Sequence, residues 1–165
     1  MAIPGLSTLG IEVGYAVVTT TSSLPAAVTS LPRCNNIGGI EFTMNSIDAS
    51  ALEDYVTKRV AGRADSPETI EMTFNNTSDV RSALNTMLTA YATSLSSDPN
   101  TLVCIEVYDP KDTTDGACWF FVQPPTQLGM SEISQNSLKT IAMSCTLVEY
   151  HGYDAGVSPS GGGSN

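Results

Sequence analysis

The sequence predicts a mainly β protein: an antiparallel β-sandwich or barrel-like subunit with one flanking α-helix. Several short segments alternate apolar and polar residues, which is the pattern of half-buried strands. Val, Ile, Thr and aromatic residues are concentrated in these segments, as strands favour. Only residues 78–95 place their apolar side chains at helical spacing. About six or seven strands and one helix fit a two-layer domain.

The first part of the chain predicts a strand followed by a long irregular segment. Residues 9–21 are rich in Val, Tyr and Thr and predict a strand. Residues 22–36 contain Pro25 and Pro32 and show little periodicity, so they predict an extended loop or arm. A loop of this length in a compact domain needs a role or is disordered.

Residues 37–62 predict a strand and then a short helical turn. In residues 37–48, Ile40, Phe42 and Met44 alternate with polar residues and are expected on the core side. Residues 49–62 have a cap candidate at their start and Gly62 as a stop signal, which favours a helical turn.

Residues 63–95 predict a charged turn, a strand and the helix. Residues 63–68 ("RADSPE") form the turn, and residues 69–75 ("TIEMTFN") alternate strictly, so one face of this strand should be buried. Residues 78–95 carry a stripe of Val, Leu, Met and Tyr at helical spacing. Thr77 or Ser78 is the expected helix cap.

The last part of the chain predicts three strands. Residues 101–110 and 116–125 flank a turn and suit a hairpin with a longer loop. Residues 138–150 predict a long closing strand. The expected core comprises Phe42, Met72, Phe74, Leu84, Leu88, Ile141 and Leu147. We expect a single domain over residues 1–150 and a flexible tail over residues 151–165, because the end is rich in Gly and Ser.

The composition points to a surface that meets partners. Charged residues make up only 15% of the 165-residue chain, which is low for a free monomer. A β-rich monomer with a Thr/Ser surface is the alternative. Seven basic residues against 17 acidic ones give a net charge of −10, which disfavours binding nucleic acid by counterion release.

The sequence predicts neither secretion nor a catalytic or metal site. No signal peptide or membrane-length apolar run is visible. Cys34, Cys104, Cys118 and Cys145 have no metal-type spacing, so we expect reduced, partly buried thiols. The single histidine, His151, lacks catalytic partners in the sequence. We expect no enzymatic activity, no cofactor and no metal.

Three stretches carry a resemblance to a known family. They are "AIPGLSTLGIEVG", "IGGIEFTMNSIDASALEDYVTKRVAGRADSPETIEMTFN" and "WFFVQPPTQLGMSEISQNSLKTIAMSCTLV". Their motifs and order resemble the major tail tube proteins of long, non-contractile-tailed bacteriophages, over residues 1 to about 150. The order of the three motifs is more specific than any one of them.

The resemblance implies a structural virion protein made in the bacterial host cytoplasm. The resemblance implies that hexameric rings stack into a tube, with strands from each subunit lining the channel that delivers the genome. The implied partners are further copies of the chain, the tape measure protein, the tail terminator, and baseplate or tip proteins. Double-stranded DNA would pass without specific binding, and no membrane is involved.

The resemblance and the alternation together predict two sets of contact residues. The residues expected to face the lumen are Glu41, Thr43, Thr69, Glu71 and Thr73. Their alternative surroundings are bulk solvent or the helix. The residues expected to contact other rings or subunits are Ile3, Pro4, Leu6, Leu24, Pro25, Val28, Leu31 and Pro32.

Two other functions fit the same sequence. A tail terminator or a tube of the type VI secretion kind would share the fold and differ in partners. An adhesion or carbohydrate-binding β-sandwich would need an exposed aromatic cluster or a metal site. Trp119, the only tryptophan, lies in an apolar run and is expected in the core or at an interface.

Overall fold

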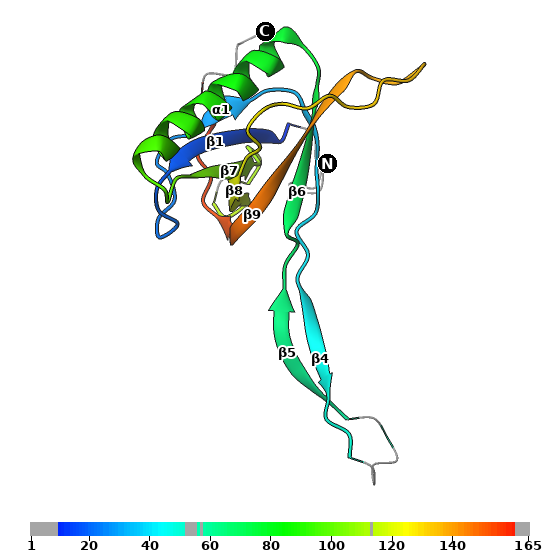
Figure 1. The fold of residues 1–165 in the computed structure, drawn as a ribbon. Coiled ribbons are helices and arrows are strands. Elements are labelled where there is room, and N and C mark those ends of the chain that lie inside the picture. Colours follow the sequence, from blue (N-terminus) through cyan, green and yellow to red (C-terminus); the bar gives the residue numbers. More distant parts are fainter. Residues whose placement is uncertain (1–9, 52–55, 57, 113, 161–165) are drawn as a thin grey trace.

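A computed structural model describes residues 10–51, 56, 58–112 and 114–160, and its main feature is an antiparallel sheet (Figure 1). Seven strands follow the order β2-β1-β7-β8-β9-β6-β3. They are β1 (Glu12–Val18), β2 (Thr29–Leu31), β3 (Cys34–Ile37), β6 (Thr69–Asn75), β7 (Leu102–Tyr108), β8 (Ala117–Gln123) and β9 (Thr140–Asp154). The remaining strands, β4 (Thr43–Asp48) and β5 (Arg59–Asp65), form a separate two-stranded hairpin.

The long strand β9 belongs to both halves of the sheet. Its first part pairs with β6, from Thr140 to Thr146. Its second part pairs with β8, and the register shifts twice along that ladder. Such bulges bend a strand. The apolar faces of both halves therefore contribute to one core.

The single helix, α1 (Ser78–Ser97), packs on one face of the sheet (Figure 1). Thr77 caps it, because the Thr77 side chain accepts a hydrogen bond from the Val80 amide. The helix buries Val80, Leu84, Met87 and Leu88. These side chains join a large core cluster with inward residues of β1, β6, β7, β8 and β9.

A second, smaller apolar cluster lies on the opposite face of β1, β7 and β8. Its buried members are Val28, Leu102, Cys104, Tyr108, Ala117, Trp119 and Phe121. No helix covers them. Instead, Leu24 and Val157, from the segments before β2 and after β9, pack against this cluster.

The predicted fold class is confirmed: the chain is mainly β and antiparallel, with one flanking helix. The strand at residues 69–75 and the helix near residues 78–95 lie where the sequence places them. Met72, Phe74, Leu84, Leu88 and Ile141 are buried, and Leu147 is half-buried against the core.

Residues 37–65 correct the sequence interpretation. The single strand expected over residues 37–48 is divided: Ile37 ends β3, and β4 begins only at Thr43. Phe42 is 51% exposed and is not a core residue. Its ring instead lies 5.2 Å, centroid to centroid, from the ring of Tyr150. The alternation is real, but no second layer covers this part of the chain.

The expected helical turn at residues 49–62 is also wrong where the structure describes it. Residues 59–62 belong to strand β5, which runs on to Asp65. The turn before β6 is therefore shorter than the six residues expected. Gly62 is not a helix stop; a Cβ atom there would lie 2.8 Å from the Asn45 carbonyl oxygen. Gly62 permits close contact between the two hairpin strands.

Two segments expected to be irregular are ordered parts of the body. Within residues 22–36, β2 and most of β3 join the sheet, connected by a tight turn at Arg33, whose φ is +55°. At the other end, β9 continues to Asp154, beyond the expected boundary at residue 150. Residues 155–160 follow as a hydrogen-bonded segment. Residues 151–154 therefore lie in β9 and residues 155–160 are hydrogen-bonded to the body, where the sequence predicts a flexible tail.

Candidate assembly surfaces

The β4–β5 hairpin projects from the body as a separate arm (Figure 1). Its strands pair only with each other, from Thr43↔Asp65 to Asp48↔Arg59. A side-chain bond from Asn45 to Asp65 and the packing of Gly62 against Asn45 add local support. Isolated two-stranded hairpins are marginally stable in water. The arm therefore lacks the support that the seven-stranded sheet gives its own strands.

The arm exposes large apolar side chains. Met44 is 65% exposed, Ile47 58% and Val60 52%. Ile47 and Val60 are directly paired across the two strands and share one face of the hairpin. Val56 is exposed as well. The exposed Ile47–Val60 pair makes that face of the hairpin a candidate protein-contact surface.

A second apolar projection is the connection between β8 and β9. This connection, yellow to orange in Figure 1, extends from the body at a different place from the hairpin. Met130, Ile133 and Leu138 are all more than half exposed. Within residues 130–138, the Ser134 and Ser137 side chains hydrogen-bond to each other and stabilise a local turn. The chain thus presents two apolar projections, each outside the two core clusters.

The open face of β6 and β9 carries part of the predicted lumen set. Thr69 and Glu71 are exposed and Thr73 is half-buried, while their strand neighbours are buried. Directly across the ladder, Glu71 faces Ser144. The β9 residues on this face are Thr140, Ala142, Ser144 and Thr146. This face is therefore small, polar and acidic.

Glu41 and Thr43 do not lie on that face. Glu41 belongs to the connection between β3 and β4, and Thr43 begins β4 at the base of the hairpin. Both are exposed. Together with Asp65, they line a shallow hollow beside the hairpin base. The structure thus divides the predicted lumen set between the sheet and the arm.

Most of the predicted inter-subunit residues that the structure describes pack within the chain. Val28 is 3% exposed and Leu31 2%, so neither offers surface to a partner. Leu24 packs on the second cluster, and Pro25 and Pro32 are half-buried. Ile3, Pro4 and Leu6 lie outside the described residues. The apolar surfaces on the hairpin and the β8–β9 connection were the contact candidates that sequence reasoning missed.

The thiols resemble buried hydrophobic groups. Burial raises the pKa of Cys34 to about 11 and that of Cys145 to about 12. Burial, and then the neighbouring Glu106 carboxyl group, raise the pKa of Cys104 to about 12. Thiolates are the reactive form, so these thiols have little nucleophilic character at neutral pH.

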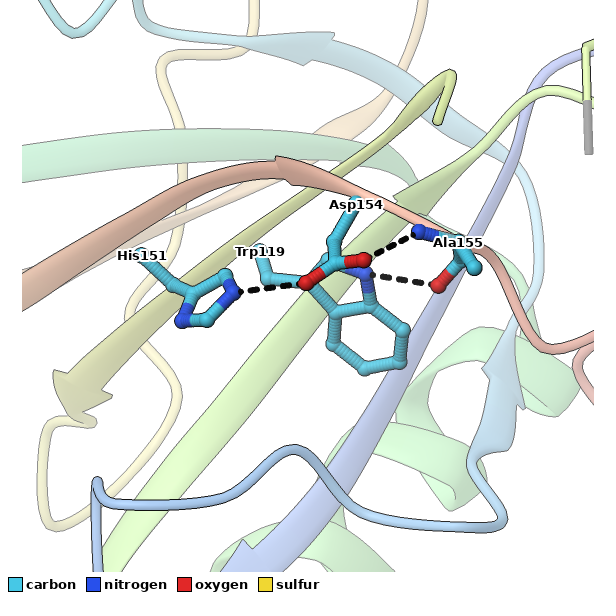
Figure 2. A network of polar contacts seen from close by, with 4 residues as sticks. All are labelled: Trp119, His151, Asp154 and Ala155. Carbon is cyan, nitrogen blue, oxygen red and sulfur yellow. Dashed lines mark hydrogen bonds and ion pairs between the residues drawn. The ribbon is translucent and has the colours of Figure 1, made fainter. Parts of the chain in front are cut away.

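The described residues assemble no cluster of three metal-ligating side chains. His151 contacts Asp154 at 3.0 Å on the surface, three residues away in the chain (Figure 2). The hydrogen bonds from His151 and from the Ala155 amide hold the pKa of Asp154 below its usual value. In the described part of the chain, no helix has the length and apolarity needed to cross a bilayer.

Glu106 is the most unusual acidic group. Its side chain is fully buried beside the second cluster, and this burial raises its pKa to about 7. The Val157 amide, which donates a hydrogen bond to it, lowers the pKa, and the nearby Glu12 carboxylate raises it. That amide lies 2.6 Å from Oε1. The other carboxyl oxygen, Oε2, has no hydrogen-bond partner among the described residues. A lone Glu in the apolar run "LVCIEVY" was the sequence signal for this site.

Comparisons with known proteins identify a fold but no family. No protein-family model matches the chain, and no curated protein matches it in sequence. Among solved structures, the chain is similar to one in a cryo-EM structure of the anti-feeding prophage (AFP) baseplate, 6-fold symmetrised. The TM-score is 0.55 at 11% identity, covering 91% of this chain and 95% of that chain.

A second similar structure is the tail of an empty GTA particle, computed with helical refinement and C6 symmetry. The TM-score is 0.47 at 10% identity, and the match covers 84% of this chain and 91% of the other. At such identities, only the baseplate match carries weight, and it shows a shared fold. Nearly the whole length of both chains takes part in that shared fold.

Proposed function

We propose that this protein is a structural subunit of a phage-tail-like particle and polymerises as stacked hexameric rings that form a tail tube. The observation that carries the proposal is the β4–β5 arm, a hairpin without a covering layer that exposes Met44, Ile47 and Val60. An arm of this kind is stabilised when it packs on a neighbouring copy. The fold shared with a chain of a 6-fold symmetrised baseplate structure supports the same assignment.

The two projections suit head-to-tail stacking. The hairpin and the β8–β9 connection are different surfaces, so a contact in which the hairpin of one copy meets the connection of the next is heterologous. Heterologous contacts propagate in one direction and generate rings or filaments. A low charged fraction agrees with a chain whose surface is largely interface.

The proposed channel wall is the open face of β6 and β9. Its exposed groups are the Glu71 carboxylate and Thr and Ser hydroxyls. A wall of acidic and small polar groups repels phosphates and releases no counterions, so DNA would slide past it. Glu41 and Thr43 are proposed to face the channel mouth at the hairpin base rather than this wall.

The finer assignment to a non-contractile tail rests on the sequence resemblance. A tail terminator or type VI-like tube is the alternative with the same fold. Carbohydrate binding is less favoured, because Trp119 is fully buried and offers no stacking platform. Absence of enzymatic activity is likewise part of the proposal. Long tubes in electron micrographs of concentrated protein would support the tail tube, and isolated rings would support a terminator.

The arm can be tested directly. Ile47→Lys should abolish tubes, because a desolvated ammonium at a contact is costly. The matched control is Thr89→Lys, at an exposed position on α1. Sedimentation velocity and negative-stain microscopy should show wild type and control assembled and the arm variant monomeric. Normal tubes from Ile47→Lys would contradict the proposal.

The channel wall needs a separate variant. Glu71→Lys should leave tubes intact, since Glu71 points away from the core, but should slow DNA ejection by particles that contain it. The control is Glu71→Gln, which removes the charge without reversing it. Normal assembly and normal ejection of the lysine variant would show that Glu71 does not line the channel.

A further inference from the structure

Residues 155–160 form a strap across the second apolar cluster. The strap begins beside Trp119, whose indole N–H donates to the Ala155 carbonyl oxygen at 3.3 Å (Figure 2). Val157 packs into the cluster. Gly156 makes this approach possible: a Cβ atom there would lie 2.5 Å from the Tyr108 ring and 3.0 Å from Ala117. The strap therefore takes the covering role on this face that α1 takes on the other.

The strap ends on the outer edge of β2. The Ser30 amide donates to the Ser160 carbonyl oxygen at 2.8 Å, and the Ser160 amide donates to the Val28 carbonyl oxygen at 3.1 Å. Thr29 and Ser160 form a parallel bridge. Because β2 is the terminal strand of the sheet, these bonds occupy the backbone groups that another strand would need.

Glu106 holds the middle of the strap. Its Oε1 accepts a hydrogen bond from the Val157 amide at 2.6 Å, while Oε2 is buried and finds no partner in the part of the chain that the structure describes. A protonated carboxyl group tolerates this environment, but a carboxylate leaves half of its charge without a hydrogen bond. The strap is therefore bonded to a buried carboxyl group that becomes less stable in this site when it ionises.

We propose that residues 155–160 are a displaceable guard of the β2 edge, that Glu106 is its latch, and that release of the strap opens this edge to a second copy of the chain. This inference rests on the proposed function, since it assigns one contact of the assembly. The incoming segment would pair with β2 through the backbone groups of Val28 and Ser30. An edge strand that the chain itself blocks keeps free subunits from pairing prematurely.

The groups around Glu106 set the direction of the response. Glu12 on β1 disfavours its charge, and Cys104 on β7 stays a neutral thiol near pH 7. Tyr108 lies beneath Gly156, and the Asp154–His151 pair lies at the start of the strap. Residues 155–160 themselves carry no titratable side chain. Because burial raises the Glu106 pKa to about 7, closure of the strap is most favourable at acid pH and weakens as pH rises toward and through 7.

The latch is tested on the unassembled subunit. Trp119, the single tryptophan, is fully buried beside the strap, so its fluorescence reports strap release. Between pH 5.5 and 8.5, wild-type emission should shift to the red, and hydrogen exchange at the Val157 and Ser160 amides should accelerate at least 10-fold beyond intrinsic rates. Glu106→Gln, which accepts the same bond without ionising, should remove both changes. An unchanged wild type, or an equal response in the variant, would overturn the latch.

The edge guard is tested by assembly. Gly156→Ala should displace the strap at all pH values and shorten the lag of tube formation several-fold at pH 6. The control is Gly39→Ala, where a Cβ atom meets nothing within 4 Å. If wild type forms tubes and Gly156→Ala is no faster, the guard is wrong and the proposed function stands. If the Trp119 fluorescence responds to pH but neither wild type nor variant assembles, the edge-guard proposal and the proposed function are both wrong. The role of Glu106 as the latch would still be supported.

Discussion

Residues 42–45, which run into β4, and strand β6 both alternate apolar and polar side chains, but their surroundings are opposite. In β6, Ile70, Met72 and Phe74 are 0–2% exposed, whereas all six residues of β4 are exposed. β6 lies between β3 and β9, and its apolar face meets the large core. Among the described residues, β4 pairs only with β5, and none of them covers either of its faces. Alternation shows that the two faces of a strand differ; the layer that covers the apolar face can belong to another molecule.

The largest effect should follow truncation in the covered strand. Phe74→Ala should lower the free energy of unfolding by about 3–5 kcal/mol, because it removes buried contacts and leaves a cavity. Urea unfolding followed by circular dichroism measures the change. A loss below about 1 kcal/mol would show that β6 is not packed as the structure has it.

The stability of the body should also fall as the pH rises from 5 to 8. Burial raises the Glu106 pKa to about 7 in the folded chain, so its stabilising contribution is complete below the pKa of the unfolded chain and declines as pH rises through 7. The unfolding free energy should fall by on the order of 2 kcal/mol between pH 5 and 8. In Glu106→Gln this decline should be largely absent; an equal decline would assign it to other groups.

The helix that covers the core depends on its cap. Thr77→Ala removes the acceptor for the Val80 amide and should cost about 1 kcal/mol. Thr89→Ala, on the exposed face of the same helix, is the control and should change little. Equal effects of the two substitutions in thermal unfolding would show that the cap does not stabilise α1.

The smallest effect should come from the uncovered strand. Ile47→Ser should change the stability of the monomer by no more than about 0.5 kcal/mol, as surface substitutions usually do. Ile70→Ser in β6 is the matched comparison and should cost several-fold more. A large loss from Ile47→Ser in a sedimentation-verified monomer would mean that the arm packs on its own body, and the contrast between β4 and β6 would disappear.

The sequence predicts elements well where local pattern and tertiary cover agree. Helix α1 and strand β6 follow from spacing alone, because both have one apolar face that the domain buries. Phe42 was misplaced because its alternation is continuous with that of β4, which has no cover. Sequence pattern contains no information on which molecule supplies the covering layer.

The sequence predictions for the strap and for the β2 segment were wrong for a different reason. "AGVSPS" has the composition of a linker, and residues 22–36 have that of an arm. Both are held by backbone hydrogen bonds and by small residues that permit close approach, such as Gly14, whose Cβ position lies 2.8 Å from Val28. Long-range backbone pairing leaves almost no trace in composition. The isolated Glu106 in an apolar strand was the available signal.

The connection of the arm to the sheet determines how a mechanical load would enter the body. In Figure 1 the hairpin continues the line of β6. A pull on the arm would therefore act along β6, against a ladder with β9 that runs from Thr69↔Thr146 to Asn75↔Thr140. Antiparallel hydrogen bonds lie perpendicular to the strands, so such a pull shears all of them together instead of opening them one by one. Tension on the arm would be shared along the whole strand, so the ladder would resist it as a unit.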